Sequence, residues 1–313
     1  MGAGSRQATL DIAPDACEAR APTPGDPPLT PQSIALKVQI VAMMVAVGLQ
    51  LRPADLLLAL RRPFRLLGMV AVNLVVFPAL VWALMMWVGA PPGLAAGVLL
   101  CAAAPGGPTG PLFTRLAGGD LGFATAAMVV LGFLGLVTAP ATVSLMLGSS
   151  GGEGLLGPMF TTLAVYQIAP LTAAMLVRRA APDLARRLAV PAARLANLCL
   201  VAVILGLLVA RGEALLSVGF GLQAALVGAL LPWLAPVALA ADAGGTLRAA
   251  GIVTAVRNLS IALLLSHSFF ADPQTDVGIL VWGFWMMVLP AALALWRRRR
   301  RADRHTAGPA DGG

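Results

Sequence analysis

The chain has 313 residues, of which 58% are hydrophobic and only 12% are charged, and its mean hydropathy is +0.85. Because a soluble domain carries about 25% charged residues, this composition excludes an ordinary soluble protein and predicts an all-α polytopic membrane protein. The formal net charge is +8. A positive excess of this size can indicate nucleic-acid binding or can reflect the orientation of a membrane protein. The positions of the arginines distinguish these two interpretations.

Nine apolar segments of membrane-spanning length follow a Pro-rich start that has no apolar run. We expect residues 1–32 to form a disordered extracytoplasmic tail without a signal peptide. A transmembrane domain is predicted over residues 33–296 and a basic cytoplasmic tail over residues 297–313. The nine predicted spans lie near residues 34–51, 65–88, 93–117, 121–147, 157–177, 188–210, 214–240, 246–271 and 276–296.

The basic residues test this topology, because cytoplasmic loops collect Lys and Arg. With the N-terminus outside and the C-terminus in the cytoplasm, seventeen of the twenty-two basic residues fall on the cytoplasmic side. We therefore predict an integral protein of a bacterial inner (plasma) membrane in this orientation. The positive charge is then an orientation signal, and no nucleic-acid partner is expected. The sequence does not indicate an oligomeric state.

The third span contains a break, in the stretch GVLLCAAAPGGPTGPLFTRLA over residues 97–117. Proline removes a backbone donor and clashes with the preceding turn, while glycine weakens a helix. In lipid, the freed backbone groups must face protein or a water-filled cavity. The break is therefore predicted to be a structural crossover and a candidate binding site, formed by Pro105, Gly106, Gly107, Pro108, Gly110 and Pro111.

The spans divide into two four-helix units, at about residues 34–147 and 188–296, which must cross the membrane in opposite directions. The broken third span then corresponds to the eighth, which carries TAVRN at its centre. Inverted repeats with unusual segments at matching positions are typical of secondary transporters with a site near the bilayer midplane.

Arg257 lies near the middle of the eighth span and has no obvious acidic partner in the predicted spans. A guanidinium cannot lose its proton there, and its insertion cost makes it a functional candidate. Carbonyls of a broken helix, an anionic substrate or a bound anion could compensate it, and a structural role as a cap of the third span stays open. The predicted substrate-binding residues are Asn73, Thr109, Arg257 and Asn258.

Other polar residues of the spans have simpler expected roles. Each asparagine could equally stabilise helix packing. We expect Thr114, Thr125, Thr138 and Ser260 to bond to their own helix backbones, and the polar pair Tyr166 and Gln167 stays open. The chain has no nucleophile–base pair, metal-ligand cluster or phosphate loop, so we predict that it is not an enzyme and holds no metal or organic cofactor.

Three motifs carry a family resemblance. The stretches CAAAPGGPTGPLFTRLAGGD and AVRNLSIALL, with GLQLRPADL before them, resemble signatures of the bile acid:sodium symporter (BASS) family, over roughly residues 36–296. The resemblance implies a core domain with two crossing discontinuous helices, a panel domain and alternating access. Asn73 matches a glutamine position of the family. Some members of the family have ten helices, and the nine spans predicted here correspond to those helices without the first.

The chain departs from this family at the positions that bind sodium. The resemblance implies hydroxyl, amide and carboxylate ligands at six positions where this chain has residues of other types. We call these the degenerate sodium positions, and they are Gly110, Pro111, Ala124, Met128, Val253 and Arg257. Hard cations need oxygen ligands, so Na⁺ stays possible as a bound ion but is disfavoured. Our hypothesis is that Arg257 occupies the sodium region as a tethered cation.

The function predicted from the sequence is secondary transport of small organic anions by alternating access, with weak or no classical Na⁺ coupling. Two alternatives stay open. One is a Na⁺-coupled symporter of bile acid-like organic anions that uses backbone carbonyls and Asn258. The other is a membrane anion receptor or scaffold that does not transport.

Overall fold

A computed structural model describes residues 31–51, 63–147, 156–239 and 244–306, and over these residues the chain is helical. The elements in order are α1 (Pro31–Gln50), α3 (Pro63–Ala71), η2 (Val72–Val76), α4 (Phe77–Trp87), α5 (Pro92–Ala103), α6 (Gly110–Ala117), α7 (Leu121–Leu147), α8 (Leu156–Leu163), η3 (Ala164–Ile168), α9 (Ala169–Ala180), α10 (Pro182–Leu216), α11 (Phe220–Leu239), α12 (Thr246–Ala255), α13 (Leu259–Phe269) and α14 (Pro273–Thr306).

Eight helical stretches among the described residues are long and apolar enough to cross a membrane. The shorter apolar helix α5 continues through a break into α6 and accounts for the third predicted span. These stretches match the nine spans read from the sequence, and the prediction of an all-α polytopic membrane protein is confirmed.

Several predicted boundaries differ from the structure. Helix α10 continues to Leu216, so the predicted start of the seventh span at residue 214 lies within α10. Helix α14 continues to Thr306, so the predicted boundary at residue 297 falls inside a helix. Arginine is a good helix former, and cations are favourable near a helix C-terminus. Residues 1–30, which are most of the predicted N-terminal tail, and residues 307–313, the end of the predicted C-terminal tail, lie outside the described residues.

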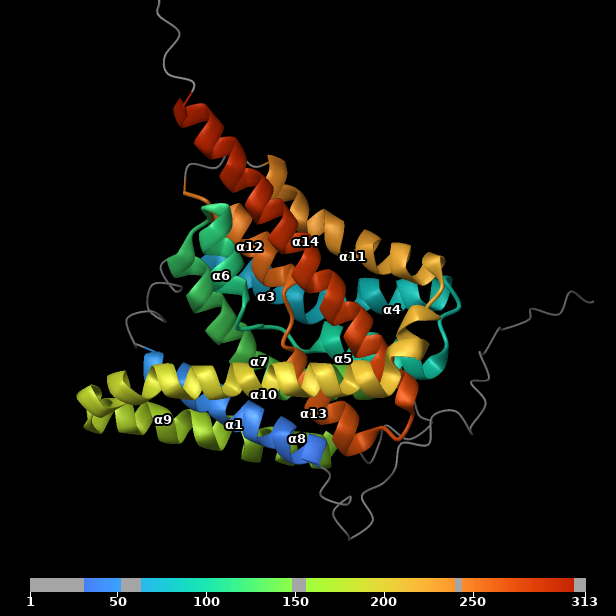
Figure 1. Ribbon diagram of the computed structural model, residues 1–313, viewed down its shortest axis with the longest axis horizontal. Coiled ribbons are helices and arrows are strands. Elements are labelled where there is room, and N and C mark those ends of the chain that lie inside the picture. The colour runs from blue at the N-terminus through green and yellow to red at the C-terminus, as the bar shows by residue number, and fades with distance from the viewer. Residues whose placement is uncertain (1–30, 52–62, 148–155, 240–243, 307–313) are drawn as a thin grey trace, which may run out of the picture.

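The helices can be grouped by their packing and named after the panel and core domains that the family resemblance implies. In the panel domain, α1, α9 and α10 lie side by side and pack on one another, and α8 and η3 precede α9 (Figure 1). The core domain contains α3, η2, α4–α7 and α11–α14, in which α5 packs against α14 and α11 against α12. The panel contacts the core through α1 against α13 and α10 against α14.

Two broken helices cross inside the core domain. The first is α5–α6, interrupted at residues 104–109, and the second is α12–α13, interrupted at residues 256–258. We call these two interruptions together the crossing. They touch directly, because the backbone N–H of Asn258 donates to the carbonyl of Ala104 at 2.8 Å. The interruptions predicted for the third and eighth spans therefore lie against each other.

Two glycines shape the first interruption, and the second of them allows it to approach the other break closely. Gly106 has φ +81°, a conformation that other residues rarely adopt. A Cβ atom on Gly107 would lie 2.4 Å from the carbonyl oxygen of Arg257. The second break needs neither Gly nor Pro, because the side chain of Asn258 accepts the backbone N–H of Ile261 at 3.4 Å and caps α13.

Two π-helical turns, η2 and η3, were not predicted. Each is followed by a proline, Pro78 or Pro170, near the start of the next α-helix. Proline cannot donate to the preceding turn, and the local change of hydrogen-bond register accommodates it. Each turn also carries a buried amide, Asn73 in η2 and Gln167 in η3.

Candidate functional site

Arg257 lies at the crossing with only 1% of its surface exposed. Its guanidinium carbon lies 3.8 Å from the centroid of the Phe77 ring in α4. The Phe77 ring in turn contacts Trp233 of α11 and Trp282 of α14, with ring centroids 5.8 Å and 5.7 Å away. Aromatic faces attract cations most strongly where water is excluded, so this cluster offers the buried charge one source of compensation.

Asn73 supplies the polar partner of Arg257. Its Oδ1 accepts a hydrogen bond from Nη1 of Arg257 at 3.0 Å, and its Nδ2 donates to the carbonyl of Met69 at 2.8 Å and to Oγ1 of Thr254 at 2.9 Å. The π-turn η2 thus holds an amide that fixes one side of the guanidinium. Nε and Nη2 of Arg257 have no hydrogen-bond partner among the described residues.

Three of the six positions that the resemblance assigned to sodium form an apolar region. Val253 and Ala124 are fully buried in one hydrophobic cluster with Leu131 and Ala249. Gly110 faces the same valine, since a Cβ on this glycine would meet Cγ2 of Val253 at 3.6 Å. No side-chain oxygen is present at these three positions, so this part of the site does not fit a hard cation.

Two helix N-termini meet at the crossing. Thr109 is the N-cap residue of α6 and makes no side-chain capping bond, while Asn258 is the N-cap of α13. The first turns of both helices therefore carry partial positive charge toward the crossing. Gly110 and Pro111, which the sequence placed in the break, are instead the first two residues of α6.

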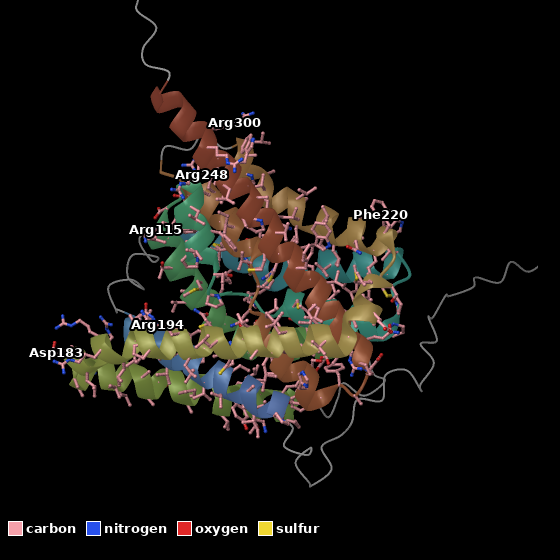
Figure 2. The ribbon with its side chains drawn as sticks, in the orientation of Figure 1. Arg115, Asp183, Arg194, Phe220, Arg248 and Arg300 are labelled. Atoms are coloured by element: carbon pink, nitrogen blue, oxygen red, sulfur yellow. The ribbon has the colours of Figure 1, made fainter. Side chains whose placement is uncertain are left out.

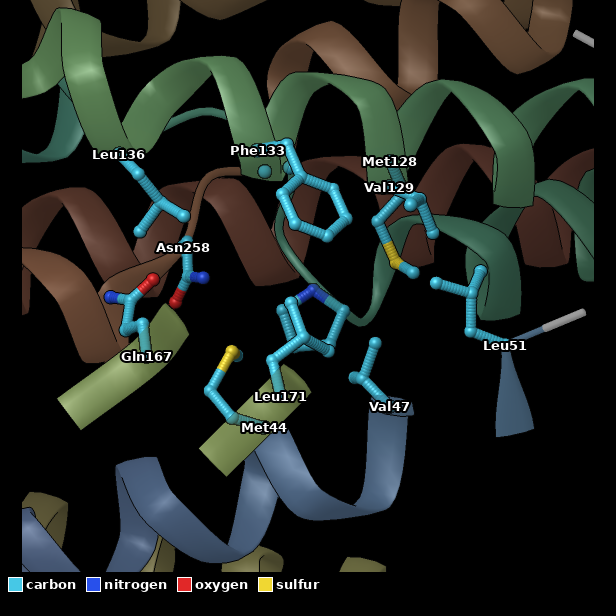
Figure 3. Close-up of a pocket in the computed structure, with 13 residues that line it drawn as sticks. Met44, Val47, Leu51, Met128, Val129, Phe133, Leu136, Gln167, Leu171 and Asn258 are labelled. Carbon is cyan, nitrogen blue, oxygen red and sulfur yellow. The ribbon is translucent and has the colours of Figure 1, made fainter. Parts of the chain in front are cut away.

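Three cavities adjoin the crossing and all are lined by Pro108. The smallest, which we call the amide pocket, has a volume of about 40 Å³. Gln167 and Asn258 lie beside each other at one end of it, and Met44, Phe133 and Leu171 form much of the remainder (Figure 3).

The mixed cavity has a volume of about 390 Å³ and lies between α1 and α10 of the panel and α6 and α7 of the core. Its wall includes the uncharged polar side chains of Gln50, Thr109, Thr125 and Asn197. Pro111 and Met128, two of the degenerate sodium positions, also line it.

The apolar groove has a volume of about 300 Å³ and lies between α10, α13 and α14. Its lining includes Thr109, Arg257 and Ser260 at the crossing, and otherwise apolar residues. Among the described residues that line the three cavities there is no Asp or Glu. Arg257 in the apolar groove is the one charged residue among these described lining residues, and its charge suits an anion.

The predicted site residues divide into two groups. Thr109, Arg257 and Asn258 line cavities, whereas Asn73 lines none of the three and contacts Arg257 instead. The crossover residues Pro105, Gly106, Gly107 and Pro108 lie in the first interruption, as predicted. The substrate-binding roles of Asn73, Thr109, Arg257 and Asn258 stay predictions.

Smaller expectations have mixed outcomes. Thr114, Thr125 and Thr138 each donate to the carbonyl four residues earlier, as predicted. The prediction for Ser260 is wrong, because its hydroxyl instead accepts a hydrogen bond from Nε2 of Gln39 in the panel at 2.8 Å. A contact between residues 221 positions apart leaves no signal in the local sequence.

The fold and the crossing define a class of protein: polytopic helical membrane proteins with two discontinuous helices, an arrangement typical of secondary transporters. The model of the Sodium Bile acid symporter family matches residues 37–217, more than half of the chain. The protein belongs to this family, whose members are transporters. No curated protein matches the chain.

Proposed function

We propose that the protein is a secondary transporter of small organic anions that works by alternating access without classical Na⁺ coupling. The guanidinium of Arg257 supplies a fixed positive charge in the region where the family holds sodium. Asn73 acts by holding Arg257 in place, while Thr109 and Asn258 present the helix N-termini that meet the anion.

One observation carries this proposal: the crossing holds a buried arginine, and the sodium positions Gly110, Ala124 and Val253 are apolar. Arg257 is compensated by Phe77 and Asn73, and Val253 stands where the resemblance places a carboxylate. A sodium ion placed next to the guanidinium would be repelled by it and would find few oxygen ligands. An anion would instead be attracted to the same region.

We also propose that the end of the molecule that carries Arg115, Arg248 and Arg300 faces the cytoplasm of a bacterial cell. Figure 2 shows these three residues toward one end and Phe220 toward the opposite end. The accumulation of arginines at one end supports the orientation in which the N-terminus is outside and the C-terminus is inside.

The proposal is tested by the thermal stability of the purified protein with acetate, butanoate, benzoate and succinate, in Na⁺ and in K⁺ buffers. A ligand that binds only the folded state stabilises it by mass action. We expect at least one carboxylate to raise the melting temperature equally in both buffers. The effect should disappear in Arg257→Ala and persist in Arg115→Ala, which removes an exposed arginine of α6.

Each other outcome favours an alternative. Stabilisation that requires Na⁺ and survives Arg257→Ala would contradict the proposal and favour a sodium symporter that uses backbone carbonyls and Asn258. Stabilisation without uptake of the same carboxylate into proteoliposomes would favour an anion receptor. The absence of any stabilisation by these carboxylates would contradict the proposed substrate class.

A further inference from the structure

The apolar groove differs from the other two cavities in its lining. Along α10 it is lined by Leu200, Ile204 and Leu208, one residue per helical turn. On the opposite side, α14 contributes six residues between positions 280 and 288, namely Leu280, Gly283, Phe284, Met286, Met287 and Val288. The groove is therefore a slot between two helices rather than a rounded pocket.

The polar groups of the groove lie where it meets the crossing. Thr109 is the N-cap residue of α6 there, and Leu259 and Ser260 are the first two residues of α13. Arg257 also lines the groove, and its Nε and Nη2 have no hydrogen-bond partner among the described residues. This end of the groove combines a positively charged residue with two helix N-termini, and it is complementary to a single anionic group.

The groove is open along its length. Phe284 is 55% exposed, Val288 is 40% exposed and Leu208 is 37% exposed. These residues lie in membrane-spanning helices, so their exposed surfaces face the lipid tails. An occupant can therefore extend from the crossing along the slot without exchanging apolar surroundings for water.

From these observations we propose that the apolar groove binds the hydrocarbon chain of an amphipathic monocarboxylate whose anionic group lies at the crossing. This inference rests on the proposed function and names its substrate class: anions with one flexible, unbranched apolar chain. The methionines of the groove, Met286 and Met287, suit such an occupant, because their flexible side chains adapt to different chain lengths.

The proposal has a quantitative consequence. Each methylene group moved from water into an apolar site improves binding by an energy that corresponds to about fourfold in affinity. Affinity should therefore rise by about fourfold per methylene while the chain fills the groove, and then stop rising. Partition into lipid would increase with chain length as well, so variants of the groove have to separate the two effects.

The test measures binding of straight-chain carboxylates from butanoate to dodecanoate to the protein in lipid nanodiscs. The variant Ile204→Trp fills the groove from α10, and Met287→Trp fills it from α14. The matched control is Leu205→Trp, since Leu205 is 55% exposed and does not line the groove. The straight-chain alcohols of the same lengths serve as uncharged ligands.

We expect the wild type and Leu205→Trp to share one chain length at which affinity stops rising. In Ile204→Trp and Met287→Trp this length should be shorter. An unchanged length in both groove variants, or no dependence on chain length, would overturn the proposal. Alcohols that bind as tightly as the carboxylates would identify the groove as a site for lipid chains and also overturn it.

The proposed function fails separately from this inference. If butanoate and its homologues do not bind at all, the organic-anion proposal itself is contradicted. If butanoate binds equally in Na⁺ and K⁺ but longer chains gain nothing, the proposed function stands and only the groove inference is lost.

Discussion

At the scale of single residues, the main question is how an arginine is kept in the interior of a membrane protein. The cost of burying an unpaired charge is several kcal/mol. A desolvated cation–π contact contributes about 2 kcal/mol, and the charged hydrogen bond to Asn73 adds about 1.5–3 kcal/mol. Phe77 and Asn73 together therefore offset a large part of the cost of Arg257.

The sequence identified the members of this group separately but could not join them. Arg257 stood out because its charge lies in mid-span, and Asn73 because its amide interrupts an apolar run. Their hydrogen bond joins residues 184 positions apart, and no local pattern records it. Phe77 was missed, since a phenylalanine in a membrane span looks like any other apolar residue.

Substitution of Asn73 tests this arrangement. In Asn73→Ala, Nη1 of Arg257 loses its acceptor in a buried site, so the free energy of unfolding should fall by about 2 kcal/mol. Asn73→Gln should retain part of that energy. Chemical unfolding in detergent, followed by Trp fluorescence, would measure both.

The control for this prediction is Asn197→Ala in the mixed cavity. Asn197 is exposed, and its loss should change the free energy of unfolding by less than about 0.5 kcal/mol. Equal stabilities of the Asn73 and Asn197 variants would mean that Asn73 does not hold the guanidinium.

At the scale of elements, the sequence predicted one break better than the other. Two prolines on either side of two glycines predicted the interruption between α5 and α6. The interruption between α12 and α13 has neither residue, and it depends on the cap by Asn258 and on the bond from Asn258 to Ala104. The second break was predictable only from the proposed repeat, in which the eighth span, with residue 257 at its centre, corresponds to the broken third span.

Gly107→Ala tests the contact between the two breaks. The added methyl group would lie 2.4 Å from the carbonyl oxygen of Arg257, so the two interruptions would have to separate. We expect a large loss of thermal stability and of carboxylate-induced stabilisation. Both are measured by melting curves in detergent with and without the carboxylate.

The matched control is Gly132→Ala in α7, where a Cβ would meet nothing within 4 Å. Alanine is favoured over glycine in a helix by about 1 kcal/mol, so this variant should be at least as stable as the wild type. A Gly107→Ala protein with a wild-type melting curve would show that the close approach of the breaks is not required.

At the scale of the whole molecule, composition and the apolar segments were enough to predict an all-helical polytopic membrane protein. The cavities could not be predicted. The mixed cavity and the apolar groove share Pro108 and Thr109 but draw their other walls from four and three helices respectively, which are distant in the sequence. Their difference in polarity depends on how panel and core pack together.

The central claim also belongs to this scale, since it concerns what the protein couples to transport. The resemblance implies oxygen ligands at Gly110, Ala124 and Val253, where this chain has apolar residues, and we propose that the fixed cation Arg257 takes the place of the ion. A transporter built in this way carries its positive charge in the chain and does not need to recruit it from solution.

The most direct test is the equilibrium binding of radioactive Na⁺ to the purified protein in nanodiscs, with and without excess unlabelled Na⁺. The same preparation should first show stabilisation by a carboxylate, which demonstrates that its site is intact. The account predicts that excess unlabelled Na⁺ displaces no bound radioactive Na⁺ from the wild type. It predicts the same result for Arg257→Lys, which keeps the positive charge. Saturable binding of Na⁺ near one ion per chain in the wild type would contradict it.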